Sequence, residues 1–114
     1  MVVQPVMAET LISAREFETW SLGKTLDFGT EEFLPDRRVR WVGTDGQCLT
    51  GQWYSDYSLI CFAYEGFSDQ HCWTFWREGD SVTARSALDR PDIPPRQVTE
   101  ARRPLSCAGP DLGV

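Results

Sequence analysis

Hydrophobic and polar residues alternate through the middle of the chain, a pattern that predicts antiparallel β-strands joined by tight turns. Asp45-Gly46 is the strongest turn signal, because both central residues of a type I′ hairpin turn need positive φ. A two-residue turn at this dipeptide pairs Thr44 with Gln47 and fixes which side chains share a face. Counting outward places Val39, Trp41 and Cys48 on one face of the hairpin, and Val42, Leu49 and Trp53 on the other.

A second turn signal fixes the register of the next two strands. If Gly66 and Phe67 are the central residues of a type II′ turn, Cys61 lies directly opposite Cys72. Only directly opposed residues bring two Cβ atoms to the separation of about 4 Å that a disulfide needs. The register therefore predicts a disulfide between Cys61 and Cys72.

Gly79-Asp80 predicts one more two-residue turn, and the three turn assignments place the apolar side chains on a common face. That face consists of Val39, Trp41, Ile60, Phe62, Trp73, Phe75, Val82 and Ala84. The predicted fold class is mainly β, an antiparallel meander of five to six strands that is curled or barrel-like. The pattern does not determine whether the edges of the sheet close into a barrel.

One short helix is predicted before the sheet. Ser13 is a suitable N-cap, and Glu16 three residues later completes a capping box. Phe17 and Trp20 belong to an apolar stripe, and Gly23 ends the helix. Because so short a helix is stable only when it is docked on a larger surface, we expect it to cover the sheet as a lid or plug.

The remaining segments are assigned by composition. Residues 25–29 are predicted to form a strand, and residues 31–36 a charged connection. Prolines recur from Leu88 onward, which predicts a Pro-rich carboxyl-terminal strap with one edge strand at residues 97–101. The length of the chain suits one domain, so we expect residues 11–114 to form a single disulfide-bonded β domain.

Residues 1–10 are expected to be a flexible amino terminus. Val6 and Ala8 are small residues at the positions that precede a signal-peptidase cut, but the charged and long apolar parts of a signal are missing. The segment is therefore either a signal-peptide remnant or a frayed terminus that resembles one by chance.

The four cysteines favour an oxidising compartment, because an even number in a small chain suits a pair of disulfides. Once Cys61 and Cys72 are paired, elimination leaves Cys48 to pair with Cys107. The alternative, a zinc site, lacks two cysteines at the short spacing of a zinc knuckle. We therefore expect a periplasmic or secreted protein.

Charge argues against several partners. The chain has 11 Lys and Arg against 17 Asp and Glu, a net charge of −6, which repels phosphate backbones and anionic lipids. No apolar stretch approaches the roughly 18 residues of a membrane-spanning helix. The glycines form no dinucleotide or phosphate-binding pattern. We expect no nucleic-acid partner, no membrane insertion, no metal and no other cofactor.

No catalytic residue is predicted. His71 is the only imidazole, and no nucleophile and orienting carboxylate stand at a spacing that would make it a catalytic base. The one basic cluster follows acidic residues that can neutralise it and is interpreted as a solvated strand edge: Arg37, Arg38 and Arg40. The candidate acids fall in turns, where aspartate is favoured for backbone reasons: Asp45, Asp56, Asp69 and Asp80.

The second face of the predicted sheet is too apolar to be left in water. It carries Leu49, Trp53, Leu59, Trp76 and the bridge between Cys61 and Cys72. Clustered exposed aromatic residues mark interaction sites, so we predict a binding surface for a partner or ligand. Its members are Trp53, Trp76, Leu49 and the turn residue Tyr57. The alternative is that the helix or the strap covers this face as a second small core.

Three short segments form a Gly-x-Trp strand followed by two cysteine-bearing strands: Gly51-Gln52-Trp53, Ile60-Cys61-Phe62 and Cys72-Trp73. The turn Arg77-Glu78-Gly79 follows them. This pattern resembles an uncharacterised family of small exported cysteine-containing β-domains from alphaproteobacteria. The resemblance covers the middle of the chain. It implies an exported β-domain with Cys61 bridged to Cys72, and it implies no activity.

Three functions are compatible with the sequence. The first is an exported, non-enzymatic binding or accessory domain that recognises a protein partner or a small apolar ligand through aromatic residues. The second is a carboxylate-dependent hydrolase acting on cell-envelope glycan or peptide, which requires acids that project from strands into a cleft. The third is a structural subunit of an envelope assembly. We expect the first, because the predicted acids lie in turns.

Overall fold

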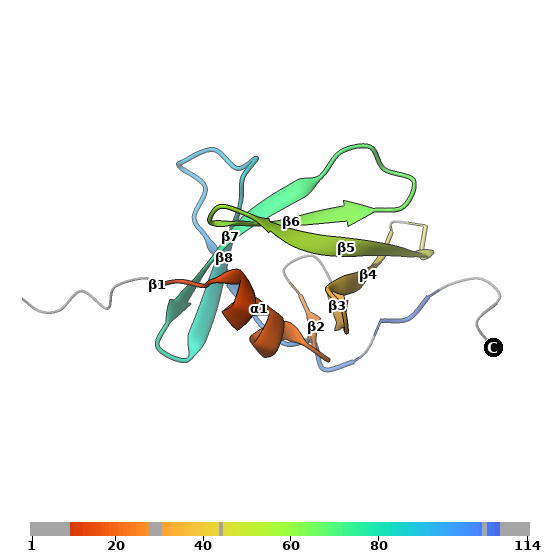
Figure 1. Cartoon of the computed structure of the whole chain (residues 1–114), viewed down its shortest axis with the longest axis horizontal. Helices are drawn as coiled ribbons and strands as arrows, with labels where there is room; N and C mark the ends of the chain where they lie inside the picture. The colour runs from red at the N-terminus through yellow and green to blue at the C-terminus, as the bar shows by residue number, and fades with distance from the viewer. Residues whose placement is uncertain (1–9, 28–30, 44, 104, 108–114) are drawn as a thin grey trace, which may run out of the picture.

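The computed structural model describes residues 10–27, 31–43, 45–103 and 105–107. Within these residues the chain forms one helix and nine strands, and all paired strands are antiparallel (Figure 1). The elements are β1 (Thr10–Leu11), α1 (Ala14–Ser21), β2 (Thr25–Leu26), β3 (Glu31–Leu34), β4 (Arg38–Val42), β5 (Cys48–Asp56), β6 (Leu59–Tyr64), β7 (His71–Glu78), β8 (Ser81–Ser86) and β9 (Arg96–Val98). The predicted fold class is confirmed, although five to six strands was too low a number.

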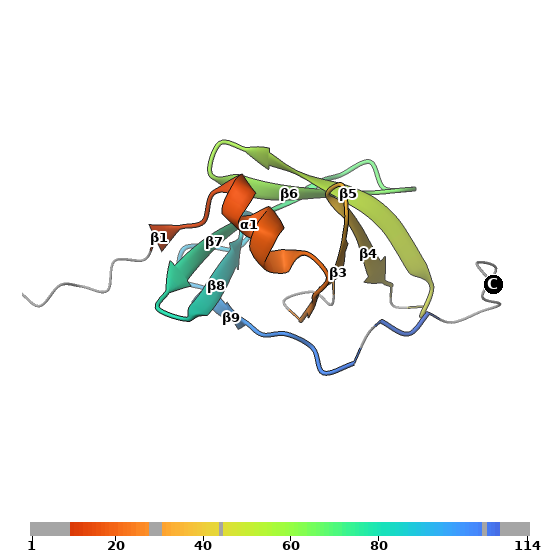
Figure 2. The same ribbon diagram turned by 60° about the horizontal axis from the view of Figure 1, so that its bottom comes forward.

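The sheet curls until its two ends nearly meet, which gives a barrel-like shape. Its strands follow the order β2-β3-β4-β5-β6-β7-β8-β9, and β1 pairs separately with β7. Just beyond β9, Glu100 forms a bridge with Leu26 of β2. The Ala101 N–H donates to the Thr25 carbonyl at 2.7 Å. Figure 2 shows the chain leaving β9 and crossing below α1 in that view. The predicted edge strand at residues 97–101 therefore joins the two ends of the sheet.

Residues 31–36 were predicted to be a charged connection, and this is wrong. Four of them form β3, in which Glu31 and Phe33 are buried and alternate with Glu32. Glu32 lies directly across from Arg40 in β4, and the two side chains form an ion pair of 2.7 Å. A cross-strand pair of this kind stabilises the sheet locally, so acidic residues here are compatible with a strand.

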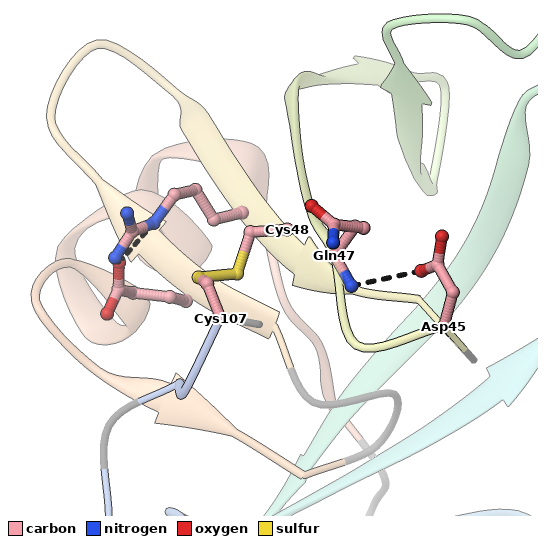
Figure 3. The surroundings of a disulfide bond; sticks show 6 residues. Asp45, Gln47, Cys48 and Cys107 are labelled. Carbon is pink, nitrogen blue, oxygen red and sulfur yellow. Dashed lines mark hydrogen bonds and ion pairs between the residues drawn. A yellow bond between two sulfur atoms is a disulfide. The ribbon is translucent and has the colours of Figure 1, made fainter. Parts of the chain in front are cut away.

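The first hairpin register differs from the prediction by one residue. Val42 pairs with Cys48, and the Gly43 N–H donates to the Gln47 carbonyl at 2.8 Å. Gly46 has φ +83°, and the Asp45 carboxylate accepts from the Gln47 N–H at 2.9 Å (Figure 3). Thr44, the predicted partner of Gln47, lies outside the described residues. The connection is thus longer than a two-residue turn.

This one-residue shift moves every side chain of β5 to the opposite face. Leu49 lies across from Trp41, and Trp53 lies across from Phe62, so both share the inner face of the barrel. The prediction that Leu49 and Trp53 face outward is therefore wrong. Cys48 pairs with Val42 and takes the outer face instead.

The other two registers are confirmed. Cys61 pairs with Cys72, and the turn at Gly79-Asp80 pairs Glu78 with Ser81. The expected type II′ turn at Gly66-Phe67 does not form, because β6 ends at Tyr64 and β7 begins at His71. A longer loop therefore joins β6 to β7, and it keeps the register that the shorter turn predicted.

Both predicted disulfides form. Cys61 and Cys72 have Cα atoms 3.9 Å apart, and Cys48 and Cys107 have Cα atoms 5.3 Å apart. The second bridge joins the start of β5 to the carboxyl-terminal segment (Figure 3). It therefore ties the predicted strap to the barrel wall.

Helix α1 closes the core of the barrel. Ser13 and Glu16 form the predicted capping box, and Phe17 is completely buried. The Phe17 ring packs against the rings of Phe33, Trp53 and Phe75, with centroids 4.6 to 5.4 Å apart. The buried hydrophobic cluster comprises Ile12, Phe17, Leu26, Phe33, Val39, Trp53, Ile60, Phe62, Phe75, Val82, Ala84 and Val98. The helix therefore acts as a plug, as its stripe predicts.

Six of the eight residues predicted for the apolar face are buried, whereas Trp41 and Trp73 are half-buried.

Among the described helices, none is long and apolar enough to cross a membrane.

Candidate functional site

A cavity of about 390 Å³ lies on the inner face of the barrel and opens beside the loop between β6 and β7. Side chains from β3, β4, β6, β7 and that loop line it. The lining residues include Glu31, Trp41, Tyr64, Phe67, Asp69, His71 and Trp73. A concave site with mainly aromatic walls and a few polar groups is typical of small-molecule binding.

Aromatic rings form most of the wall. The ring centroid of Trp41 lies 5.6 Å from that of Tyr64 and 6.4 Å from that of Phe67. Phe67 belongs to the loop between β6 and β7 and is largely exposed. Trp41 thus lies close both to a wall residue of the barrel and to a residue of this loop, and all three rings line the cavity.

Glu31 is the unusual polar group of the cavity. It lies directly across from Trp41, and its side chain is only 6% exposed because β3 turns it inward. Neither Glu31 Oε2 nor Tyr64 Oη makes a hydrogen bond of normal geometry among the described residues, although the Tyr64 hydroxyl lies near enough to the Glu31 carboxyl to lower its pKa. Buried polar atoms without partners are uncommon in proteins, and they mark places where a ligand or water completes the site.

Burial controls the ionisation of this pair. Loss of solvation raises the pKa of Glu31 and outweighs the opposite effect of the neighbouring Tyr64 hydroxyl, so the pKa is about 8. Burial and the adjacent Glu31 raise the pKa of Tyr64 as well. At neutral pH the cavity therefore holds a carboxyl group that is largely protonated and a neutral phenol.

His71 and Asp69 stand at the opening of the cavity. His71 pairs with Phe62 across β6 and β7, so its side chain lies on the inner face, and it remains exposed at the strand end. Asp69 belongs to the loop between these strands. No lysine or arginine lines the cavity in the part of the chain that the structure describes. The ionisable groups of the cavity are thus two acids, one phenol and one imidazole.

The four predicted binding residues do not form one surface. Trp53 is 3% exposed, and its ring lies under the Arg37 guanidinium at 4.5 Å. Leu49 is half-buried on the inner face, across from Trp41. The prediction that both contribute to an open outer face is wrong, because the register of β5 differs by one residue.

The other two predicted binding residues lie outside the core. Trp76 alternates with buried Phe75 and therefore faces outward, where it is half-buried and pairs with Leu11 of β1. Tyr57 is completely exposed in the tight turn between β5 and β6, where its φ is +55°. Neither residue lines the cavity. Whether Trp76 or Tyr57 binds anything stays a prediction.

The sequence did not lead us to predict this cavity, although it contains signals that place two of the lining residues on the inner face. His71 is on the inner face by the same register that pairs Cys61 with Cys72. Glu31 stands two positions before Phe33, which is the period of side chains on one face of a strand. No pattern in the sequence indicates that the loop after β6 brings Phe67 toward Trp41.

Two arginines of the basic cluster pair with acids, as predicted, but one of these acids lies in α1, and the predicted strand edge is wrong because β4 pairs with β3 and with β5. Arg40 pairs with Glu32 at 2.7 Å, whereas Arg37 pairs with Glu18 of α1 at 2.9 Å. Arg37 thus links the helix to the barrel. Within the described residues, no group of three or more His, Cys, Asp or Glu side chains could hold a metal ion.

Comparison with protein families, with curated proteins and with solved structures found no match.

Proposed function

We propose that this protein is a small exported binding domain that takes up a small, largely apolar ligand in its barrel cavity. The observation that carries the proposal is the aromatic wall of Trp41, Tyr64 and Phe67 around a space of about 390 Å³. Rings of this kind supply large contact areas at little entropic cost. The buried polar atoms of Glu31 and Tyr64 would fix the orientation of the ligand.

A small molecule fits the structure better than a protein partner does. Large exposed hydrophobic side chains are separated along the described chain: Leu11, Leu22, Tyr57, Phe67, Leu88 and Ile93. Only Phe67 among them lines the cavity. Protein interfaces usually need a contiguous core of buried anchors, and side chains that are separated along the sequence do not by themselves indicate one.

Export is part of the proposal. The two disulfides support it, because such bonds persist in the periplasm and outside the cell and are rare in a reducing cytosol. The resemblance to the alphaproteobacterial family of small exported β-domains points the same way.

Titration with the neutral fluorescent dye N-phenyl-1-naphthylamine tests the binding function. We expect saturable enhancement of dye fluorescence, and Trp41→Ala should weaken binding at least roughly tenfold because it removes a central anchor. Tyr57→Ala is the matched control, since Tyr57 is an aromatic residue that touches no part of the cavity. Absence of saturable binding, or equal losses in both variants, would count against the cavity as the site.

One observation favours a second function, hydrolysis by carboxylates. Glu31 projects from a strand into the cavity, and its raised pKa is that of a carboxyl group able to donate a proton at neutral pH. Turnover of p-nitrophenyl glycosides that disappears in Glu31→Gln would support this function. Turnover that survives the substitution would show that Glu31 is not its general acid.

A further inference from the structure

We propose that the ligand of the cavity is a small organic cation, an amine or a quaternary ammonium, whose charge lies between the Glu31 carboxylate and the rings of Trp41, Tyr64 and Phe67. This inference rests on the proposed binding function and names the chemical class of its ligand.

Three aromatic rings lie close together in the cavity. Trp41, the best ring type for attracting cations, has the rings of Tyr64 and Phe67 near it, with centroids 5.6 and 6.4 Å away. A positive charge near Trp41 therefore lies within reach of more than one negative ring face. Trp73 is less suited to this role, because the Arg96 guanidinium already lies over its ring at 5.9 Å.

Charge complementarity supplies the second argument. Among the residues that the structure describes, Glu31 Oε2 is buried without a well-formed hydrogen bond, and no lysine or arginine lines the cavity to neutralise it. Arg40 is committed to Glu32 on the same strand pair. Burial without a counter-charge keeps this carboxyl group protonated in the free protein, and a cation brought by the ligand would supply the partner that its ionised form lacks. Asp69 at the opening adds a second acid on the entry path.

Binding of a cation must then be coupled to the loss of the Glu31 proton. The carboxyl of Glu31 has to ionise to pair with the ligand, and burial holds its pKa near 8 in the free protein. Binding below that pH therefore releases a proton, and affinity rises with pH until Glu31 is ionised in the free state. The other titratable groups that line the cavity are Tyr64 of β6, His71 of β7 and Asp69 of the loop.

An isosteric pair of probes tests the inference on the unmodified protein. Choline carries a permanent charge, and 3,3-dimethylbutan-1-ol replaces its nitrogen with carbon. Isothermal titration calorimetry at pH 8 should show choline binding at least roughly tenfold more tightly. The affinity for choline should rise roughly tenfold or more between pH 6 and pH 8, whereas that for the alcohol should not. At pH 6.5 the apparent enthalpy should vary with the ionisation enthalpy of the buffer, because a proton is released.

Two neighbouring variants locate the charge. Glu31→Gln should reduce the affinity for choline at least roughly tenfold at pH 8 and leave the affinity for the alcohol nearly unchanged. Glu32→Gln is the matched control, because it removes the adjacent carboxylate on the opposite face of β3 and should change neither affinity.

The outcomes separate the two proposals. Binding of N-phenyl-1-naphthylamine without any preference for choline over the alcohol, or an affinity for choline that does not depend on pH, overturns the cation class and leaves cavity binding intact. If neither the dye nor either probe binds, both proposals fail. An equal loss of choline affinity in Glu31→Gln and Glu32→Gln overturns the assignment to Glu31.

Discussion

Phe17 of the helix meets Trp53 of the barrel wall edge to face, with ring centroids 5.1 Å apart and planes at 86°. Edge-to-face packing of this kind is favourable beyond the area that it buries. Because Trp53 reaches Phe17 only from the inner face, the contact exists only in the observed register of β5. Helix docking and strand register therefore support one another.

Replacing Trp53 with alanine should destabilise the protein by about 3 to 5 kcal/mol, the usual loss when a large buried aromatic side chain is removed. The measurement is urea denaturation followed by circular dichroism. Tyr57→Ala is the control and should change the free energy of unfolding by less than about 0.5 kcal/mol, because Tyr57 is completely exposed. A Trp53 variant as stable as the control would contradict the inward placement.

The two ends of the sheet are joined where residues 25–27 meet residues 99–101, and Asp27→Ala should weaken this joint. The Asp27 carboxylate accepts from the Thr99 N–H at 3.0 Å and from the Thr99 hydroxyl. Loss of these bonds should cost about 1 to 2 kcal/mol and speed hydrogen exchange at the Ala101 amide, which donates across the joint. Asp92→Ala, which removes an exposed pair with Arg90, should leave exchange there unchanged. Equal exchange in both variants would show that Asp27 does not hold the joint.

The two disulfides should differ in their effect on stability. On the chain-entropy model, the bridge between Cys48 and Cys107, 59 residues apart, contributes about 4 kcal/mol, and that between Cys61 and Cys72, 11 apart, about 3 kcal/mol. Double alanine variants of each pair, compared by urea denaturation, test this order. Peptide mapping without reduction tests the pairing, and a peptide in which Cys48 is linked to Cys61 would contradict both bridges.

The parts of the fold predicted correctly depend on local signals. The capping box at Ser13 and Glu16 and the tight turn at Gly79-Asp80 are set by residues close in sequence. The pairing of Cys61 with Cys72 also followed from a local count, even though the loop there is longer than the turn assumed. Errors of turn type and of register are separable, because a loop can grow without shifting the strands that it joins.

The parts predicted wrongly depend on contacts distant in sequence. At Asp45-Gly46 one extra loop residue reverses every side chain of β5, and contacts distant in sequence, such as the packing of Trp53 on Phe17, distinguish the two registers. Glu31 belongs to β3, a strand that is held in the sheet by the burial of Phe33 and by the ion pair between Glu32 and Arg40. Its acidic neighbourhood favoured a connection, so the most informative residue of the cavity was missed.

Stability of the ligand-free protein should decrease as the pH rises from about 5 to 8.5. Burial places the pKa of Glu31 near 8 in the folded protein, against an ordinary value of 4.5, so between these values the folded state binds more protons than the unfolded state. The contribution is complete below the unfolded pKa and is lost as the pH rises through the folded one. The full loss amounts to roughly 3 to 5 kcal/mol.

Urea denaturation at several pH values between 5 and 8.5 measures this loss in wild type, Glu31→Gln and Glu32→Gln. Glu31→Gln should flatten the profile, because glutamine has no proton to lose, and at pH 8.5 it should be more stable than wild type. Glu32→Gln should keep the wild-type slope, since its carboxylate pairs with Arg40 outside the cavity. A wild-type slope in Glu31→Gln would mean that another group releases the proton, and the buried carboxyl would then no longer explain the ionisation of the cavity.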